Sequence, residues 1–130
     1  AEGWQLSNVP ILGMAAMKAS LEIFAEAGIP ALREKSEKLT GYLEYTIDEL
    51  AREFPDADIN VITPRDAGQR GCQISVDIAG HERKLFDDMI AAGLIVDFRE
   101  PCVIRMAPVP LYNSFEDVFT FGRVMRELLA

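Results

Sequence analysis

The sequence predicts an α+β fold in which a small, mostly antiparallel sheet of about four short strands packs against helices, in the order α-α-β-β-α-β-β-α. Two observations lead to this prediction. Segments with apolar residues at helical spacing are interrupted by short runs rich in β-branched residues. These short runs occur as two adjacent pairs, and neighbouring strands joined by a few polar residues form antiparallel hairpins.

Two helices are expected at the start of the chain. "SNVPILGMAAMKASLEIFAEAG" offers Ser7 or Asn8 as an N-cap, places Pro10 in the first turn and ends at Gly28, a residue type favoured just after a helix. Pro30 then starts a second helix, whose charged face is expected to be solvated. The apolar stripes are Met14, Met17, Leu21 and Phe24 in the first helix, and Leu32, Leu39, Leu43, Ile47, Leu50 and Phe54 in the second.

The strands are expected in the second half of the chain. They are "INVITP" (59–64) and "GCQISVDI" (71–78), then "LIVDF" (94–98) and "CVIRMA" (102–107). "HERKLFDDMIAAG" predicts a helix between the two pairs, and "REP" is a tight connection within the second pair. "SFEDVFTFGRVMRELL" predicts a final amphipathic helix with Ser114 as its cap and Asp117 as an acid in its first turn.

Composition excludes several classes of function. The 130 residues suffice for one domain with a real core, and the net charge of −8 without a basic cluster argues against nucleic acid as a partner. No apolar run approaches the roughly 20 residues that span a membrane. With one histidine and no metal-binding motif, we expect no metal site. Cys72 and Cys102 are interpreted as buried thiols of a cytoplasmic protein, with a disulfide as the alternative.

Arg105 is the first candidate for a functional residue. It lies in "VIRMAPVPLYNSFEDV" (103–118), in an apolar strand that is about to end. A charged guanidinium is rarely buried without a partner, so one interpretation is a strand-end arginine that reaches water or pairs with an acid of the chain. The other is an arginine that grips a ligand carboxylate through two parallel hydrogen bonds, held in place by the following "APVP".

The other polar candidates have simpler interpretations. His81 is a polar residue at a helix start, with a general base as the alternative, and Asn8 is by default a helix cap. Tyr112 and Asn113 are turn residues by default. The glycines of "AGQRG" lack the strand and helix context of a phosphate-binding loop.

Several strings together resemble a known family. "LSNVPIL", "ASLEIF", "LTGYLEY", "RGCQIS" and above all "IRMAPVPLYNSFEDV" are similar, in order and over nearly the whole chain, to the carboxy-terminal part of kynureninases. These are pyridoxal-phosphate enzymes of the aspartate-aminotransferase fold type. Their final strand, turn and helix also resemble the looser pattern of cysteine desulfurases and class V aminotransferases.

The resemblance implies an activity and two site residues. Kynureninases hydrolyse L-kynurenine or 3-hydroxykynurenine to anthranilate or 3-hydroxyanthranilate plus L-alanine, in tryptophan catabolism and NAD biosynthesis, and they act as homodimers. The family's "IR-x-AP" arginine, which binds the substrate α-carboxylate, corresponds to Arg105. The asparagine of its "SN-x-P" string, which lies beside the cofactor, corresponds to Asn8.

One part of the family's site has no counterpart here. The four lysines all fall on polar faces of predicted helices, and none matches the motif of the lysine that forms the Schiff base with the cofactor. The four lysines are Lys18, Lys35, Lys38 and Lys84. The resemblance therefore implies a piece of a longer protein that is inactive alone, in which 1–28 leads from a large domain and 29–130 is the small domain. The apolar residues of the first helix would then form an exposed patch.

A stand-alone α+β module that binds a ligand without catalysis is the alternative of a different class.

Overall fold

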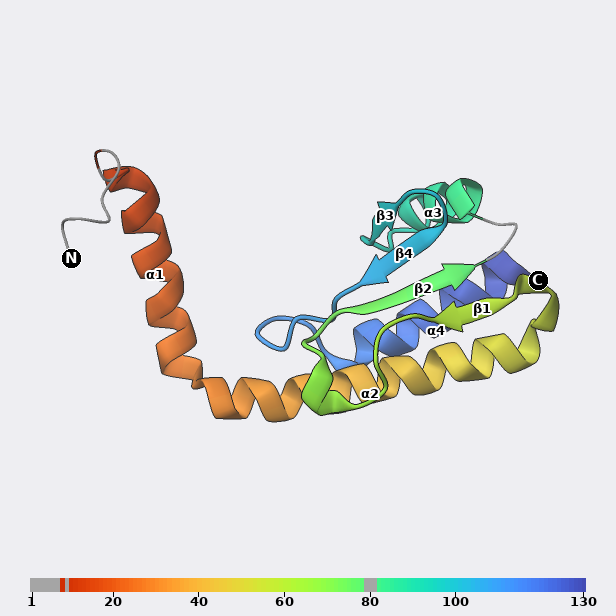
Figure 1. Cartoon of the computed structure of the whole chain (residues 1–130), viewed down its shortest axis with the longest axis horizontal. Helices are drawn as coiled ribbons and strands as arrows, with labels where there is room; N and C mark the ends of the chain where they lie inside the picture. The colour runs from red at the N-terminus through yellow and green to blue at the C-terminus, as the bar shows by residue number, and fades with distance from the viewer. Residues whose placement is uncertain (1–7, 9, 79–81) are drawn as a thin grey trace.

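The computed structural model of the chain describes residues 8, 10–78 and 82–130 and has the predicted α+β fold (Figure 1). The element order matches the prediction from the sequence. The helices are α1 (Ile11–Ala27), α2 (Ile29–Glu53), α3 (Glu82–Ala91) and α4 (Phe115–Leu129). The strands are β1 (Ile59–Val61), β2 (Ile74–Ile78), β3 (Asp97–Arg99) and β4 (Val103–Met106). Single 3₁₀ turns lie between α2 and β1, η2 (Pro55–Ala57), and between β1 and β2, η3 (Ala67–Gln69).

The strands form one antiparallel sheet in the order β1-β2-β4-β3. Both predicted hairpins are present, and the pairing of β2 with β4 joins them at the centre, where Val76 lies opposite Ile104. Side chains alternate along each strand, so every second residue points to the same face. On β2 and β4 the buried set is Ile74, Val76, Ile78, Ile104 and Met106. One face of the sheet therefore belongs to the core.

Helices α2 and α4 pack against this buried face (Figure 1). The predicted stripe of α2 supplies Leu39, Leu43, Ile47 and Leu50, all at most 3% exposed. Burying one such side chain stabilises the fold by roughly 1.5–3 kcal/mol. Helix α4 contributes Val118, Phe121 and Met125 to the same core, and α3 adds Leu85 and Met89.

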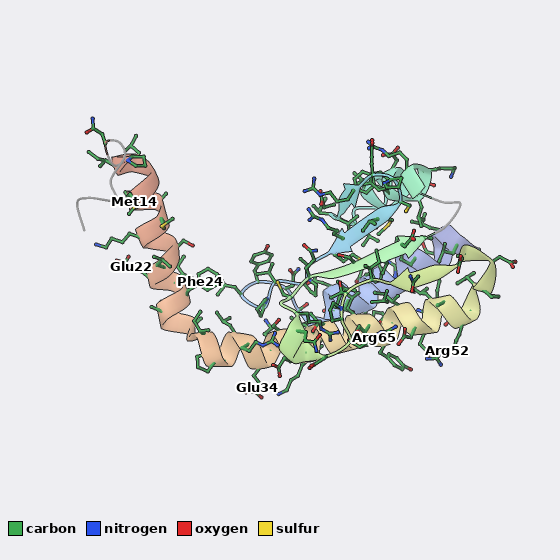
Figure 2. All side chains as sticks on the ribbon, in the orientation of Figure 1. Met14, Glu22, Phe24, Glu34, Arg52 and Arg65 are labelled. Carbon is green, nitrogen blue, oxygen red and sulfur yellow. The ribbon has the colours of Figure 1, made fainter. Side chains whose placement is uncertain are left out.

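Helix α1 is different, because none of its residues is buried. It leaves the body at Gly28, whose φ of +79° is a conformation that glycine adopts readily. Figure 2 shows Met14 far from the sheet on this projecting helix. From the sequence we expect an exposed apolar patch here. Met14 and Met17 are 48% and 57% exposed, whereas Phe24 is half-buried.

The start of α1 corrects one prediction. The helix begins at Ile11, with Pro10 as its N-cap residue and no side-chain capping bond, so Pro10 does not lie in the first turn. Proline disfavours helical backbone in the residue before it, so a proline favours a helix that begins at its own position or later. Asn8 is therefore not the cap, and Ser7 lies outside the described residues.

The second predicted hairpin also needs a correction. We expect a strand over 94–98, but β3 covers only Asp97–Arg99. The chain first closes α3 with a Schellman motif: Leu94 N–H donates to Met89 O (2.9 Å), and Gly93 N–H donates to Ile90 O (3.0 Å). The first of these bonds uses the N–H of Leu94, the first residue of the predicted strand. β1 and β2 are likewise shorter than predicted.

The cysteines lie beside strands rather than within them. Cys72 precedes β2 and Cys102 precedes β4, and both are half-buried thiols rather than buried ones. None of the described helices is long and apolar enough to cross a bilayer.

Candidate functional site

Arg105 projects from the sheet face that the helices leave open. Its strand neighbours Ile104 and Met106 are buried on the helix side, so the alternation of β4 sends the arginine to the opposite face. The side chain is 31% exposed, which keeps it accessible while the strand fixes its base. The register of the sheet places Ser75 of β2 on one side of it and Asp97 of β3 on the other.

Asp97 is the ion-pair partner of Arg105. Nε of Arg105 donates to Oδ2 of Asp97 at 2.6 Å, and Nη2 contacts the same oxygen. Nε of Arg99 lies 3.1 Å from this oxygen as well. Of the two interpretations that the sequence leaves open, pairing with an acid of the chain is confirmed. Binding of a ligand carboxylate by Arg105 stays a prediction.

The turn after β4 is held by Asn113. Its side-chain Oδ1 accepts from Val109 N–H at 2.8 Å, and its backbone N–H donates to Val109 O at 2.8 Å. Pro108, which directly precedes this turn, is buried. Asn113 is thus a turn residue, as expected by default, while Tyr112 next to it is 74% exposed. The turn fixes the end of the strand that carries Arg105.

Asp117 connects this turn to α4 as the acidic member of a capping box with Ser114. Its Oδ2 accepts from Ser114 N–H at 2.7 Å and from Asn113 Nδ2 at 3.3 Å. These hydrogen bonds, the Ser114 backbone bond first, lower the pKa of Asp117 below its ordinary value. The predicted cap is confirmed, and it anchors the helix behind the site.

An ionic cluster that the sequence did not predict fixes the loop between β1 and β2 on α2. Arg70 places Nη2 2.5 Å from Oε2 of Glu44, and both side chains are almost buried. Arg65 donates two hydrogen bonds, of 2.8 and 2.9 Å, to Asp48, and Figure 2 shows it beside α2. The signal in the sequence was Glu44, an acid next to Leu43 in the apolar stripe. This loop leads into β2, which pairs with β4.

A groove of about 490 Å³ opens near the end of β4, but Arg105 does not line it. Its walls are residues 93–96, residues 106–108 and the first turns of α4, with Asn113 and Asp117 among the polar lining residues. The groove and the arginine therefore do not form one pocket in this chain.

The structure does not bring Asn8 and Arg105 together. Asn8 is exposed and precedes α1, a 17-residue helix that extends about 25 Å away from its junction with the body. His81 lies outside the described residues. Within the described part of the chain, no group of three or more His, Cys, Asp or Glu residues is arranged to hold a metal ion.

The lysines lie on helices, as the sequence predicts. Lys18, Lys38 and Lys84 each pair with an acid one turn away on the same helix. Lys35 of α2 is half-buried and contributes to lowering the pKa of Asp117. None of the four lines the groove at the end of β4.

Comparison with known proteins gives consistent matches. A family model described as the kynureninase C-terminal domain matches residues 32–125. Kynureninase of Myxococcus xanthus is 52% identical over 125 residues, which are 96% of this chain and 28% of that protein. Kynureninases of Flavobacterium psychrophilum (46% identical, 98% of this chain, 30% of that protein) and Xanthomonas euvesicatoria (53%, 93% and 28%) match similarly. The chain thus spans less than a third of the length of these curated relatives.

Proposed function

Because the chain belongs to the kynureninase family, as its C-terminal domain, we propose that it is part of an enzyme that hydrolyses the Cβ–Cγ bond of kynurenines. The substrate is L-kynurenine or 3-hydroxykynurenine, and the products are anthranilate or 3-hydroxyanthranilate plus L-alanine. The observation that carries the proposal is the identity of about half of the residues, over almost the entire chain, to proteins named kynureninase. The same match favours this family over cysteine desulfurases and class V aminotransferases.

In this proposal Arg105 binds the α-carboxylate of the substrate. Its guanidinium lies on the open face of the sheet, is partly exposed, and is fixed by β4 and the turn behind it. A planar guanidinium can donate two parallel hydrogen bonds to a carboxylate, which orients the substrate as well as binding it. The strand and the turn hold the side chain's base, so the amino-acid end of the substrate would meet a preformed partner.

Pyridoxal phosphate, the cofactor that the family implies, acts as an electron sink in bond cleavage. Three of the four lysines pair with acids on exposed helix faces and Lys35 lies near the α4 cap, which supports the proposal that none of the four forms the Schiff base. We propose that the lysine-bearing large domain lies in the part of the protein that this chain does not cover. Asn8 would lie beside the cofactor there, and 1–28 would lead from the large domain into the small domain, 29–130.

Two further features belong to the same proposal. The whole protein would be a cytoplasmic homodimer that builds its site between two subunits, and α1 would pack on the large domain through its apolar residues. Light scattering of the whole protein tests the first feature, with a dimer as the expected result. A monomer with full activity would contradict it.

The role of Arg105 is tested in the whole protein by following anthranilate release from L-kynurenine. Removing one partner of a charge pair costs about 2–5 kcal/mol, so Arg105→Ala should lower kcat/KM by roughly 30-fold or more. Arg105→Lys should not restore it, because lysine cannot reproduce the two-bond grip. Arg123→Ala is the matched control, since Arg123 pairs with Glu127 on an exposed face of α4. An unchanged kcat/KM in Arg105→Ala would rule out the role.

The expectation that this chain is inactive alone has a separate test. The 130-residue chain is mixed with pyridoxal phosphate, and the absorption band of a protein-bound Schiff base at roughly 420 nm is measured. We expect no stoichiometric band. A band that disappears when one of the four lysines is replaced would contradict the expectation and favour a stand-alone ligand-binding module.

A further inference from the structure

We propose that Asp97 is a positioning residue for Arg105: it holds one edge of the guanidinium so that the other edge faces an incoming carboxylate. This inference rests on the proposed function of Arg105 and deepens it. Asp97 would act through the arginine and would not touch the substrate.

The geometry of the guanidinium supports this role first. Arginine offers two edges that can each bind a carboxylate, Nε with Nη2 and Nη1 with Nη2. Asp97 occupies the first edge through a single oxygen, Oδ2. In the part of the chain that the structure describes, Nη1 of Arg105 has no hydrogen-bond partner. The second edge is therefore left for a ligand.

The register of the hairpin supports it as well. Asp97 and Arg105 are directly opposed across β3 and β4, so both side chains emerge from the same face, close to each other. β3 is only three residues long and ends at Arg99, just before the connection to β4. The pairing of β3 with β4 thus fixes the backbone of Asp97 directly opposite Arg105.

The charge of the cluster is compatible with an anionic ligand. A carboxylate that positions an arginine also neutralises it, which would weaken attraction for an anion. Here the carboxylate is shared, because Arg99 Nε lies 3.1 Å from the same oxygen. The cluster of Arg99, Arg105 and Asp97, with two guanidinium groups and one carboxylate, carries one net positive charge. The site can therefore hold its arginine still and remain attractive to a carboxylate.

The same geometry would also allow the opposite function, in which Asp97 competes with the substrate for Arg105. The two functions differ in the sign of the effect of neutralising Asp97. If Asp97 positions the arginine, neutralisation increases the disorder that binding must remove, and KM rises. If Asp97 competes, neutralisation frees the arginine, and KM falls.

The experiment uses the whole protein, including the part that precedes this chain, and measures KM and kcat for L-kynurenine in Asp97→Asn, Arg105→Ala and the double variant. We expect Asp97→Asn to raise KM by about two- to tenfold while kcat stays within about twofold. In the Arg105→Ala background the same substitution should have no further effect, because the residue acts through the arginine. Asp77→Asn is the matched control: Asp77 lies on the same face of the sheet, opposite Val103.

The possible outcomes separate the two proposals. If Arg105→Ala leaves KM and kcat/KM unchanged, the proposed function of Arg105 fails. If Arg105→Ala is impaired but Asp97→Asn has an unchanged or lower KM, only the positioning role fails. An equal effect of Asp97→Asn in both backgrounds would indicate a structural role and overturn the inference. Should Asp97→Asn not fold, Asp97→Glu is used instead, because it keeps the charge and shifts it by one methylene. The inference then requires that Asp97→Glu raises KM in the protein that retains Arg105 and has no effect in the Arg105→Ala background.

Discussion

Helices α1 and α2 follow each other across Gly28, but only the second belongs to the core. The 17 residues of α1 include no buried side chain, whereas α2 buries eight of its 25. Helix α2 has one apolar stripe and one charged face, which is the pattern of a helix on the surface of a core. The exposed apolar residues of α1 are spread more widely around it: Ile11, Leu12, Met14, Met17, Leu21 and Ile23.

The different distribution of apolar residues indicates how much of each helix surface has to be covered by other protein. A helix that is apolar on most sides is typical of one that is surrounded by protein, and large exposed apolar surfaces mark interaction sites. Helix α2 finds its partners within the chain. Helix α1 meets the described body mainly at its junction with α2 (Figure 1). The body is therefore expected to be stable without α1. Matched leucine substitutions and the removal of α1 test this contrast directly, and two further experiments measure what contacts within the body contribute.

The largest effect is expected from shortening matched leucines. Leu39 of α2 is fully buried and Leu21 of α1 is 60% exposed. Leu39→Ala should lower the free energy of unfolding by about 2–5 kcal/mol, because it leaves a cavity in the core. Leu21→Ala should change it by less than about 0.5 kcal/mol. Urea unfolding of the 130-residue chain measures both, and equal losses would show that α1 has a partner in the fold.

The contact between α2 and α4 should be the next most sensitive feature. A Cβ at Gly122 would lie 2.6 Å from Cγ2 of Thr46. Gly41 on α2 faces open space, so Gly41→Ala measures the helix-propensity gain alone. Relative to that control, Gly122→Ala should be less stable by about 1–3 kcal/mol. Adding Thr46→Ser removes the clashing methyl, and failure of this second change to restore stability would contradict the close contact.

The α4 cap should produce a smaller, pH-dependent effect. Because the pKa of Asp117 is lower in the folded chain than its ordinary value of 3.8, the ionised form stabilises the fold. This contribution is complete above that value and is lost as the pH falls through the lower folded pKa. Asp117→Asn should therefore lower the free energy of unfolding at neutral pH. Below about pH 4, the further loss of stability should be smaller in this variant than in the unchanged chain.

Glu116→Gln is the control for the Asp117 experiment, since it removes the same charge from the same helical turn. Chemical denaturation at a series of pH values measures both variants. If the two variants showed the same pH dependence, helix charge alone, rather than the hydrogen bonds to Ser114 and Asn113, would account for the effect.

The smallest effect is expected from removing α1. A chain that begins at Gly28 should unfold with a free energy within about 0.5 kcal/mol of that of the full 130 residues, because no side chain of α1 is buried. Removing Leu12 and its exposed neighbours should also reduce self-association, which sedimentation can measure. A large loss of stability would mean that α1 supports the body.

Local pattern was sufficient to predict most of the elements. The stripe from Leu39 to Leu50 specified α2, and Ser114 with Asp117 specified the start of α4. The end of α3 was harder to predict, because "LIVDF" has strand composition while Leu94 is used to close the helix. Strand propensity describes how residues fit a sheet. It contains no information about backbone N–H groups, such as that of Leu94, that donate hydrogen bonds to the end of the preceding helix.

The site was only partly predictable for a related reason. The composition around Arg105 indicated a charge that needs a partner, but the identity of the partner depends on register. Asp97 and Arg105 meet because β3 and β4 pair at that position, and a shift of one residue would send one of the two side chains to the other face. The cluster of Arg70 and Glu44 likewise joins residues far apart in the sequence. Pairings of this kind appear only when the fold is assembled.

Gly28 has a mechanical consequence for the whole arrangement. Its φ is +79°, and it is the single residue between the end of α1 and the start of α2, so it is the pivot at which α1 meets the rest of the fold. Helix α1 then behaves as a lever of about 25 Å, so a rotation of about 10° at the pivot moves its far end by roughly 4 Å. If α1 were held in place, the same rotation would instead swing the sheet and the guanidinium of Arg105. The torsions of one residue thus set where that charge points.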